Sequence, residues 1–266
     1  MPDARPVGVF DSGVGGVSVL REIHALLPGE DLLYVADSGY APYGEKSPAF
    51  ITARSQAIIG HLIEQGAKAI VIACNTATAA AARTVRARWP DLPIIGMEPA
   101  VKPAAAATRH GVVGVLATTG TLHSAQFAAL LDHFGRDVHV VTRPGVGLVE
   151  CVEQGALDAP ATRQLLASHL APLLEAGADV VVLGCTHYVF LRAQVEALVG
   201  PDVRVIDTGR AVAEQLRRRL TEADRLGAGA APGRLRFWAS GDLASVGRTL
   251  HALSPQDAGE VSALPV

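Results

Sequence analysis

The sequence contains little cysteine and little lysine. Its three cysteines, Cys74, Cys151 and Cys185, are an odd number among 266 residues and stand far apart. Such a set does not form a disulfide framework, so we expect reduced thiols. The lysines, at positions 46, 68 and 102, lack the setting of a Schiff-base lysine for pyridoxal phosphate. We therefore expect each lysine to be a solvated surface charge.

An excess of one charge and long apolar runs are missing as well. The net charge is −3 and the isoelectric point is near 6.3, so there is no basic surface for nucleic acid and no electrostatic attraction to a membrane. The first residues, M-P-D-A-R-P, do not form a signal peptide, and no stretch reaches the length of a membrane span. We expect a cytoplasmic protein whose partner is a small molecule.

Short β-branched runs alternate with amphipathic segments along the chain, which predicts parallel sheets with helices on both faces. We expect strands at 7–10, 32–36, 94–95, 112–116, 138–141, 203–206 and 235–239, and in the runs before Cys74 and Cys185. We expect helices at 17–27, 48–66, 75–89, 146–154, 162–176 and 190–199, and one that ends at Phe134. A surface loop is expected at 227–233 and a poorly ordered tail after Leu253.

Two stretches of the chain resemble each other, and each contains a cysteine directly after an apolar run. Residues 69–78 read A-I-V-I-A-C-N-T-A-T, and residues 179–188 read D-V-V-V-L-G-C-T-H-Y. Cys74 and Cys185 thus follow the carboxyl ends of buried parallel strands. Two further strands end in hydroxyl and glycine residues, at Asp11 and Thr118, at similar distances before each cysteine. The double occurrence predicts a duplicated α/β unit that binds its ligand at the strand ends.

Other interpretations of these residues remain open. A lone buried cysteine is usually a core residue, although a matched pair is harder to explain in that way. Three glycines between positions 13 and 16 resemble part of a dinucleotide-binding motif but lack its third glycine position and its acidic residue. Cys74, Cys185 and His187 offer zinc-type donors, yet their spacing is unusual and no fourth ligand is evident. A nucleotide or a metal is therefore a weaker hypothesis than a reaction of two thiols.

Two thiols on opposite sides of a cleft suit one kind of reaction. Inverting a stereocentre by proton transfer needs a base on one face of the carbon and an acid on the other. Two similar domains with opposed strand ends would place Cys74 and Cys185 in this way. Both cysteines precede helices, whose N-termini lower the pKa of a thiol and offer N–H groups to an anionic substrate.

Four motifs together resemble those of the bacterial glutamate racemases. They are D-S-G-V-G-G from Asp11, P-Y-G at 42–44, A-C-N-T-A at 73–77 and G-C-T-H-Y at 184–188. The resemblance implies a cofactor-independent enzyme that interconverts L- and D-glutamate and supplies D-glutamate for peptidoglycan. It also implies a homodimer, and two similar doubly wound α/β domains related by pseudo-two-fold symmetry with the active site between them. The first domain would comprise 1–97 and 208–266, because the C-terminal segment returns to it, and the second 98–207.

The resemblance also implies roles for individual residues. Cys74 would remove the α-proton from D-glutamate, assisted by Asp11, and Cys185 would remove it from L-glutamate, assisted by His187. Glu150 would orient His187, with Glu153 as the alternative. The substrate contacts of the family fall on Asp11, Ser12, Tyr43, Gly44, Asn75, Thr76, Thr119, Thr121, Thr186 and His187. Their hydroxyl, amide and backbone N–H groups suit two carboxylates and an ammonium, and no metal ligand is implied.

One segment departs from the family pattern. Residues 142–145 read T-R-P-G where relatives often carry Ala-Cys-Pro before a glycine, so Arg143 replaces a common cysteine. We interpret Cys151, on a predicted helix, as a packing residue. Two other functions stay open, a racemase for aspartate or a related amino acid and a non-catalytic protein that senses a small anion or binds a partner. The intact pair of Cys74 and Cys185 argues against a purely binding role.

Overall fold

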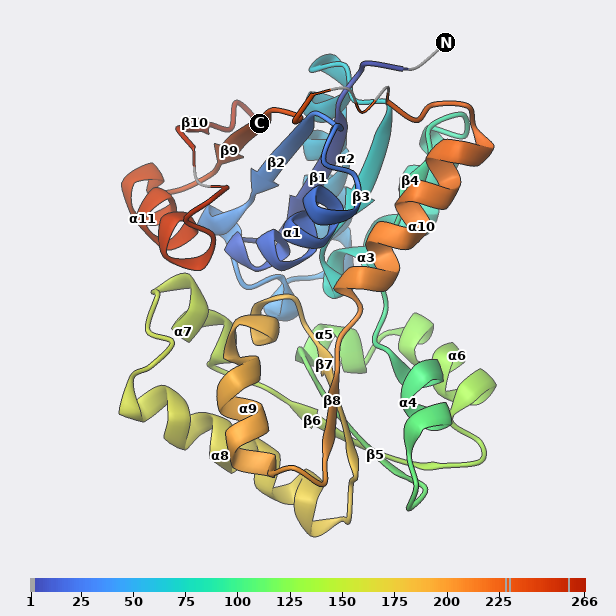
Figure 1. Cartoon of the computed structure of the whole chain (residues 1–266), viewed down its shortest axis with the longest axis vertical. Coiled ribbons are helices and arrows are strands. Elements are labelled where there is room, and N and C mark those ends of the chain that lie inside the picture. Colours follow the sequence, from blue (N-terminus) through green and yellow to red (C-terminus); the bar gives the residue numbers. More distant parts are fainter. Residues whose placement is uncertain (1–2, 228, 230, 258) are drawn as a thin grey trace.

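The structure is a computed structural model of the chain, and it describes residues 3–227, 229, 231–257 and 259–266. These residues form two parallel β-sheets, each surrounded by helices (Figure 1). The first sheet contains β1 (Val7–Asp11), β2 (Leu32–Ala36), β3 (Ala69–Ile72), β4 (Ile94–Ile95), β9 (Leu235–Ala239) and β10 (Val261–Ala263). The second contains β5 (Val112–Ala117), β6 (His139–Pro144), β7 (Val180–Gly184) and β8 (Arg204–Ile206).

Both sheets repeat one arrangement of four strands. The order is β2-β1-β3-β4 in the first sheet and β6-β5-β7-β8 in the second, and β9 and β10 extend the first sheet beyond β2. Every pairing is parallel. Strands β1, β2, β3 and β7 are buried throughout, because their apolar, largely β-branched side chains are covered on both faces. The prediction of two similar parallel α/β units is confirmed.

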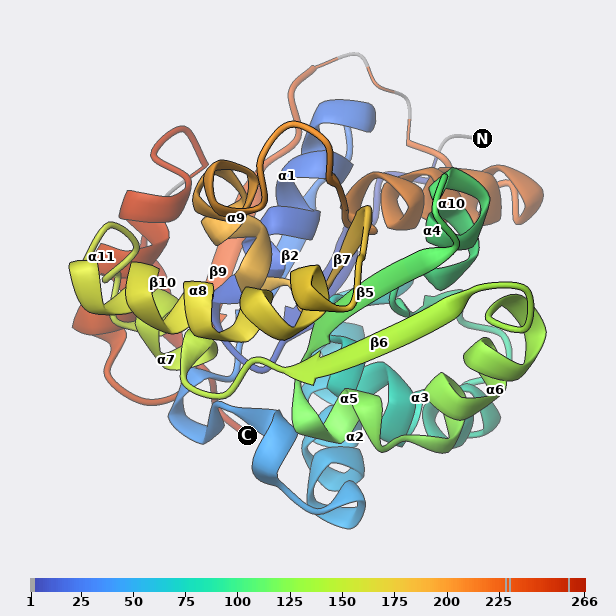
Figure 2. The same ribbon diagram turned by 90° about the horizontal axis from the view of Figure 1, so that it is seen from below.

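Helices cover both faces of each sheet, as the view from below also shows (Figure 2). In the first half, α1 (Val17–Leu26), α10 (Gly209–Glu222) and α11 (Leu243–Leu253) pack on one face, and α2 (Pro48–Glu64) and α3 (Asn75–Arg88) on the other. In the second half, α7 (Leu148–Glu153), α8 (Pro160–Glu175) and α9 (Arg192–Val199) cover one face, and α4 (Val101–Ala107) and α6 (Ala125–Phe134) the other. One apolar core runs through both halves, from Leu216 on α10 to Leu170 on α8.

The C-terminal part of the chain differs from the sequence-based predictions. Helix α10 was not among the predicted helices, and it packs against α1. The tail after Leu253 is ordered in part, because β10 pairs with β9 at the edge of the first sheet. A three-residue strand of Val, Ser and Ala carries too little apolar periodicity to be recognised from sequence. Positions 228 and 230 of the predicted surface loop lie outside the described residues.

Lys68 is not a surface charge. Its side chain is fully buried, and Nζ lies 2.5 Å from Glu30 Oε2 and donates a 2.6 Å hydrogen bond to the carbonyl of Asp3. Glu30 Oε1 in turn accepts a hydrogen bond from the backbone N–H of Gly227 at 2.6 Å. Lys68 precedes β3 and Glu30 precedes β2, so this buried ion pair lies at the amino ends of the strands. A buried ammonium is tolerated there because a carboxylate compensates its charge.

Candidate active site

The carboxyl ends of the strands of both halves meet around one cavity. Asp11 is the last residue of β1, and Cys74 follows β3 as the N-cap of α3. In the second half, Cys185 directly follows β7, and Thr118 follows β5 as the N-cap of α5 (Thr119–Leu122). All four residues line this cavity, which we call the inner cavity. The equivalent strand ends therefore supply both thiols to one site, as the sequence predicts.

Cys74 lies in an anionic and buried environment. Its Sγ is 3.7 Å from Ser12 Oγ and accepts a hydrogen bond from the backbone N–H of Ala77 at 3.4 Å. Burial, followed by the charge of Asp11, raises the pKa of the Cys74 thiol well above its ordinary value. The sequence-based expectation of a lowered pKa at the start of a helix is therefore wrong for Cys74, because desolvation outweighs the single backbone N–H. The raised pKa favours the neutral thiol of Cys74.

Asp11 connects the two halves beside Cys74. Its carboxylate accepts hydrogen bonds from the backbone N–H of Ser12 at 2.6 Å and from Thr186 Oγ1 of the second half at 2.9 Å. Complete burial raises the pKa of Asp11, since it outweighs the charge of His187 and these hydrogen bonds. Thr186 also accepts, at its carbonyl, a 3.2 Å hydrogen bond from Ser18 Oγ. The predicted contact residue Thr186 thus links the two halves at the cavity through Asp11 and Ser18.

Cys185 lies beside a cation instead. Its Sγ is 3.8 Å from His187 Nδ1, and His187 Nε2 is 2.6 Å from Glu153 Oε1. Burial lowers the pKa of His187, but the hydrogen bonds and charges of Cys185 and Glu153 outweigh it and raise that pKa well above the ordinary value. Burial raises the pKa of Glu153, whereas His187 and the N–H of Val14 lower it by more. The pair is therefore an imidazolium and a carboxylate.

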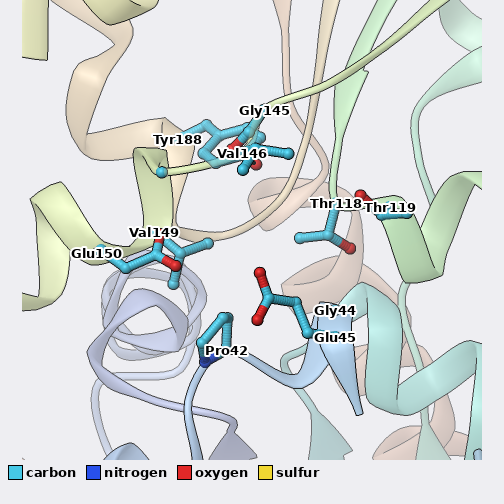
Figure 3. Close-up of a pocket in the computed structure, with 11 residues that line it drawn as sticks. Pro42, Gly44, Glu45, Thr118, Thr119, Gly145, Val146, Val149, Glu150 and Tyr188 are labelled. Carbon is cyan, nitrogen blue, oxygen red and sulfur yellow. Dashed lines mark hydrogen bonds between the residues drawn. The ribbon is translucent and has the colours of Figure 1, made fainter. Parts of the chain in front are cut away.

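Glu153, and not Glu150, is the partner of His187. Glu153 Oε1 also accepts a hydrogen bond from the backbone N–H of Val14 at 2.7 Å, and Oε2 accepts one from Ser38 Oγ at 3.0 Å. Glu150 instead lines a second cavity at the mouth of the cleft, which we call the outer cavity, where it lies opposite Glu45 (Figure 3). The two glutamates lie three positions apart on α7, so both are near the cleft. Only the tertiary position of the helix decides which one reaches His187.

The glycines after Asp11 have a steric role at this site. A Cβ atom at Gly15 would lie 2.3 Å from His187 Nδ1, and one at Gly13 would lie 1.9 Å from Glu153 Oε1. Any side chain at either position would displace the imidazole or the carboxylate of the second half. The motif weighed above as a dinucleotide-binding loop therefore leaves room for the pair of His187 and Glu153.

The structure brings most of the predicted substrate contacts to the inner cavity. Those that line it are Asp11, Ser12, Tyr43, Gly44, Asn75, Thr76, Thr186 and His187. Neither Nδ2 nor Oδ1 of buried Asn75 has a hydrogen-bond partner among the described residues. Such a buried amide is costly unless a ligand or water completes its hydrogen bonds. Asn75 is therefore well placed to bind a polar substrate.

Two predicted threonines do not line the inner cavity. Thr119 lies at the outer cavity, and buried Thr121 lies behind Thr118, with its Oγ1 3.0 Å from Thr118 Oγ1. Thr118 takes their place, and its Oγ1 is 2.8 Å from Thr76 Oγ1 across the cleft. The sequence carried a signal for Thr118, because it directly follows the strand β5, while Asp11 is the last residue of β1. Pro42, from the P-Y-G motif at 42–44, and Val149 also line the inner cavity. No pattern in the sequence indicated Val149.

We predict that Glu153→Gln and Glu150→Gln have different effects. A hydrogen bond to a charged group contributes about 1.5–3 kcal/mol, so Glu153→Gln should slow catalysis about 10- to 100-fold. Glu153 raises the pKa of His187. If catalysis needs the imidazolium, loss of the carboxylate should move the alkaline limb of the kcat against pH profile to lower pH.

The measurement is a pH series of kcat for both variants and the wild type. Glu150→Gln is the matched control on the same helix, and its alkaline limb should coincide with that of the wild type. A shifted limb in Glu150→Gln with a wild-type limb in Glu153→Gln would contradict the assignment of Glu153.

Two further findings concern possible ligands and membranes. Among the described residues, no group of three or more His, Cys, Asp or Glu side chains is arranged to hold a metal ion. Within the same residues, no helix is long and apolar enough to cross a membrane.

Comparison with known proteins gives one consistent result. The model of the Asp/Glu/hydantoin racemase family matches residues 7–216. A glutamate racemase of Ectopseudomonas mendocina is 61% identical over 255 residues, which cover 96% of this chain and 95% of that protein. The crystal structure of a Francisella tularensis glutamate racemase with D-glutamate matches with a TM-score of 0.85 at 27% identity, covering 98% of each chain. That of the Escherichia coli glutamate racemase with L-glutamate and the activator UDP-MurNAc-Ala matches with a TM-score of 0.83 at 32% identity, covering 97% of each.

Proposed function

The chain belongs to the Asp/Glu/hydantoin racemase family and is an isomerase of the glutamate racemase type, and we propose that Cys74 and Cys185 are its acid and base. The observation that carries this proposal is the placement of both cysteines at equivalent strand ends of the two halves, around one cavity. A single group would return the proton to the face from which it was taken. Two groups on opposite faces invert the α-carbon.

In the proposed reaction the two thiols exchange roles with the direction. From L-glutamate, the thiolate of Cys185 takes the α-proton, and the thiol of Cys74 donates its proton to the opposite face of the carbanion. The product is D-glutamate, with Cys185 now protonated and Cys74 a thiolate. From D-glutamate, Cys74 is the base and Cys185 the acid. Each turnover therefore needs one sulfur charged and the other neutral at its start.

The unlike neighbours of the two sulfurs support this division. The raised pKa of Cys74 favours the neutral thiol, which is the acid for L-glutamate. The imidazolium of His187 beside Cys185 places a positive charge where an anionic sulfur is needed. Asp11 and His187 are thus proposed to assist the sulfur that each adjoins. The amide of Asn75 and the hydroxyls of Ser12, Thr76, Thr118 and Thr186 are proposed to bind the carboxylates and the ammonium of glutamate.

Two wider parts of the proposal rest on the family resemblance. The D-glutamate formed is proposed to supply peptidoglycan synthesis, and the chain is proposed to act as a homodimer. Crystal structures of relatives with L-glutamate and with D-glutamate support glutamate as the substrate.

The circular dichroism of L-glutamate, followed with purified protein, a chelator and no added cofactor, tests the proposed function. We expect the signal to decay to zero, since equal amounts of the two enantiomers cancel, while the signal of L-aspartate in a parallel sample stays constant. Decay of aspartate alone would keep the thiol reaction and change the substrate. No decay of either signal would contradict a cofactor-independent racemase and favour a binding protein.

A further inference from the structure

One wall of the inner cavity is a loop without regular strands or long helices. It connects β2 to α2 and contains two short 3-10 turns, Ser38–Tyr40 and Tyr43–Glu45. Its residues Pro42, Tyr43 and Gly44 line the cavity. Gly44 approaches the second half closely, because a Cβ atom there would lie 3.0 Å from Thr118 Cβ. The position of this loop therefore determines the shape of the inner cavity on the side of the first half.

The loop is fixed from behind by a buried carboxylate. Asp37, at the start of the loop, is fully buried and accepts hydrogen bonds from four donor groups on three other residues. Tyr43 Oη donates at 2.5 Å, Arg54 Nε and Nη2 donate at 2.9 and 2.7 Å, and Ser240 Oγ donates at 2.8 Å. The hydroxyl of Tyr43 is thus already used within the protein. Asp37, Arg54 and Ser240 do not line the inner cavity.

Arg54 holds both turns of this loop to α2. Its side chain is only 13% exposed, and its guanidinium forms a bidentate ion pair with the carboxylate of Asp37. The carbon of the same guanidinium lies 4.4 Å from the centre of the Tyr40 ring. Through Asp37 it is also linked to Tyr43 in the second turn. A planar guanidinium can do this because it combines two parallel hydrogen bonds with stacking on an aromatic face.

We propose that Arg54 and Asp37 are positioning residues for the substrate wall formed by Pro42, Tyr43 and Gly44. This inference rests on the proposed function. The wall contacts glutamate before the reaction as well as during it, so its displacement weakens binding in the ground state and in the transition state alike. Such a uniform loss raises KM and leaves kcat nearly unchanged. The two sulfurs, Asp11 and His187 lie on other elements. Ser38 of the loop donates a hydrogen bond to Glu153 Oε2, but Glu153 Oε1 keeps its contacts with His187 and the Val14 N–H when the loop shifts.

The test compares Arg54→Met with the wild type in initial-rate assays on L-glutamate. We expect KM to rise about 10- to 100-fold and kcat to change less than about threefold, which is the result of losing binding energy that is equal in the ground state and the transition state. Arg54→Lys keeps the charge but loses the bidentate contact with Asp37, so its KM should lie between those of the wild type and Arg54→Met. The kcat against pH profile should remain that of the wild type in both variants.

Lys68→Met is the matched control. It also breaks a buried ion pair of the first half, but this pair lies at the amino ends of the strands, whereas the cavity lies at their carboxyl ends. We expect it to lower the melting temperature while KM stays that of the wild type. If Arg54→Met likewise lowers only the melting temperature, the pair of Arg54 and Asp37 is merely structural and the proposal is wrong. A loss confined to kcat would also overturn it.

Ser240→Ala keeps the proposal testable if Arg54→Met does not fold. It removes one donor to Asp37, and Ser240 does not line the inner cavity. We expect a rise of KM of a few-fold with kcat retained, whereas an unchanged KM would contradict the proposal. Failure of the proposed function has a different result, since wild-type protein would then not racemise L-glutamate at all. In that case calorimetry would measure the Kd of L-glutamate for the wild type and for Arg54→Met. A Kd about 10- to 100-fold higher in Arg54→Met would support the inference, and an unchanged Kd would contradict it.

Discussion

Cys74→Ala and Cys185→Ala are each expected to abolish racemisation of glutamate in both directions. Every turnover uses one sulfur as base and the other as acid, so a variant with one sulfur completes neither direction. Loss of a group that transfers a proton in the rate-limiting step costs at least about 10²–10⁴ in rate, and loss of an obligatory one costs more. Both side chains are small and buried, so alanine should leave the fold intact.

The measurement is circular dichroism of L- and D-glutamate, with the far-ultraviolet spectrum of each variant as the check on folding. Cys151→Ala is the matched control, because Cys151 lies half-buried on α7 and lines neither the inner nor the outer cavity. It should racemise at the wild-type rate. Near wild-type turnover by either Cys74→Ala or Cys185→Ala would show that the two-base account is wrong.

Asp11→Asn and His187→Asn are expected to lower kcat by about 10²–10⁴, the usual contribution of a group that assists proton transfer. Asparagine at position 11 replaces an acceptor of the Ser12 N–H and the Thr186 hydroxyl with a neutral amide. Asparagine at position 187 removes the charged ring beside Cys185. In both variants the sulfur keeps its place and loses the group that adjusts its charge.

Rates at saturating L-glutamate test this prediction. Asp179→Asn and His24→Asn are suitable controls, because Asp179 and His24 also make side-chain hydrogen bonds but lie outside the cleft. Both controls should keep the wild-type kcat. An unchanged kcat in Asp11→Asn or His187→Asn would reduce that residue to a structural role.

The strand ends of the site were predictable from the sequence because they depend on local pattern. A buried β-branched run followed by Cys74 or Cys185 places the thiol at a known edge of a parallel sheet, whatever the rest of the chain does. The same reasoning located Asp11. The choice between Glu150 and Glu153 was not predictable, since it depends on how α7 sits against the first half. The sequence did mark Thr118, which directly follows β5, although the resemblance indicated Thr119 and Thr121 instead.

Other features escaped the sequence analysis because they are properties of pairs. Lys68 is buried only because Glu30, far away in the chain, meets it. β10 exists only because β9 offers an open edge. The contacts of Arg54 with Asp37 and Tyr40 join a helix to a loop that has no periodicity of its own. Each depends on a partner that a single window of sequence does not contain.

The unlike surroundings of the two sulfurs have a consequence for the kinetics. L- and D-glutamate are mirror images with equal free energies in water, so the equilibrium constant of the reaction is unity and kcat/KM must be the same in both directions. The difference between Asp11 beside Cys74 and His187 beside Cys185 therefore appears only in kcat and KM taken separately. Whichever enantiomer has the lower KM is turned over more slowly, by the same factor.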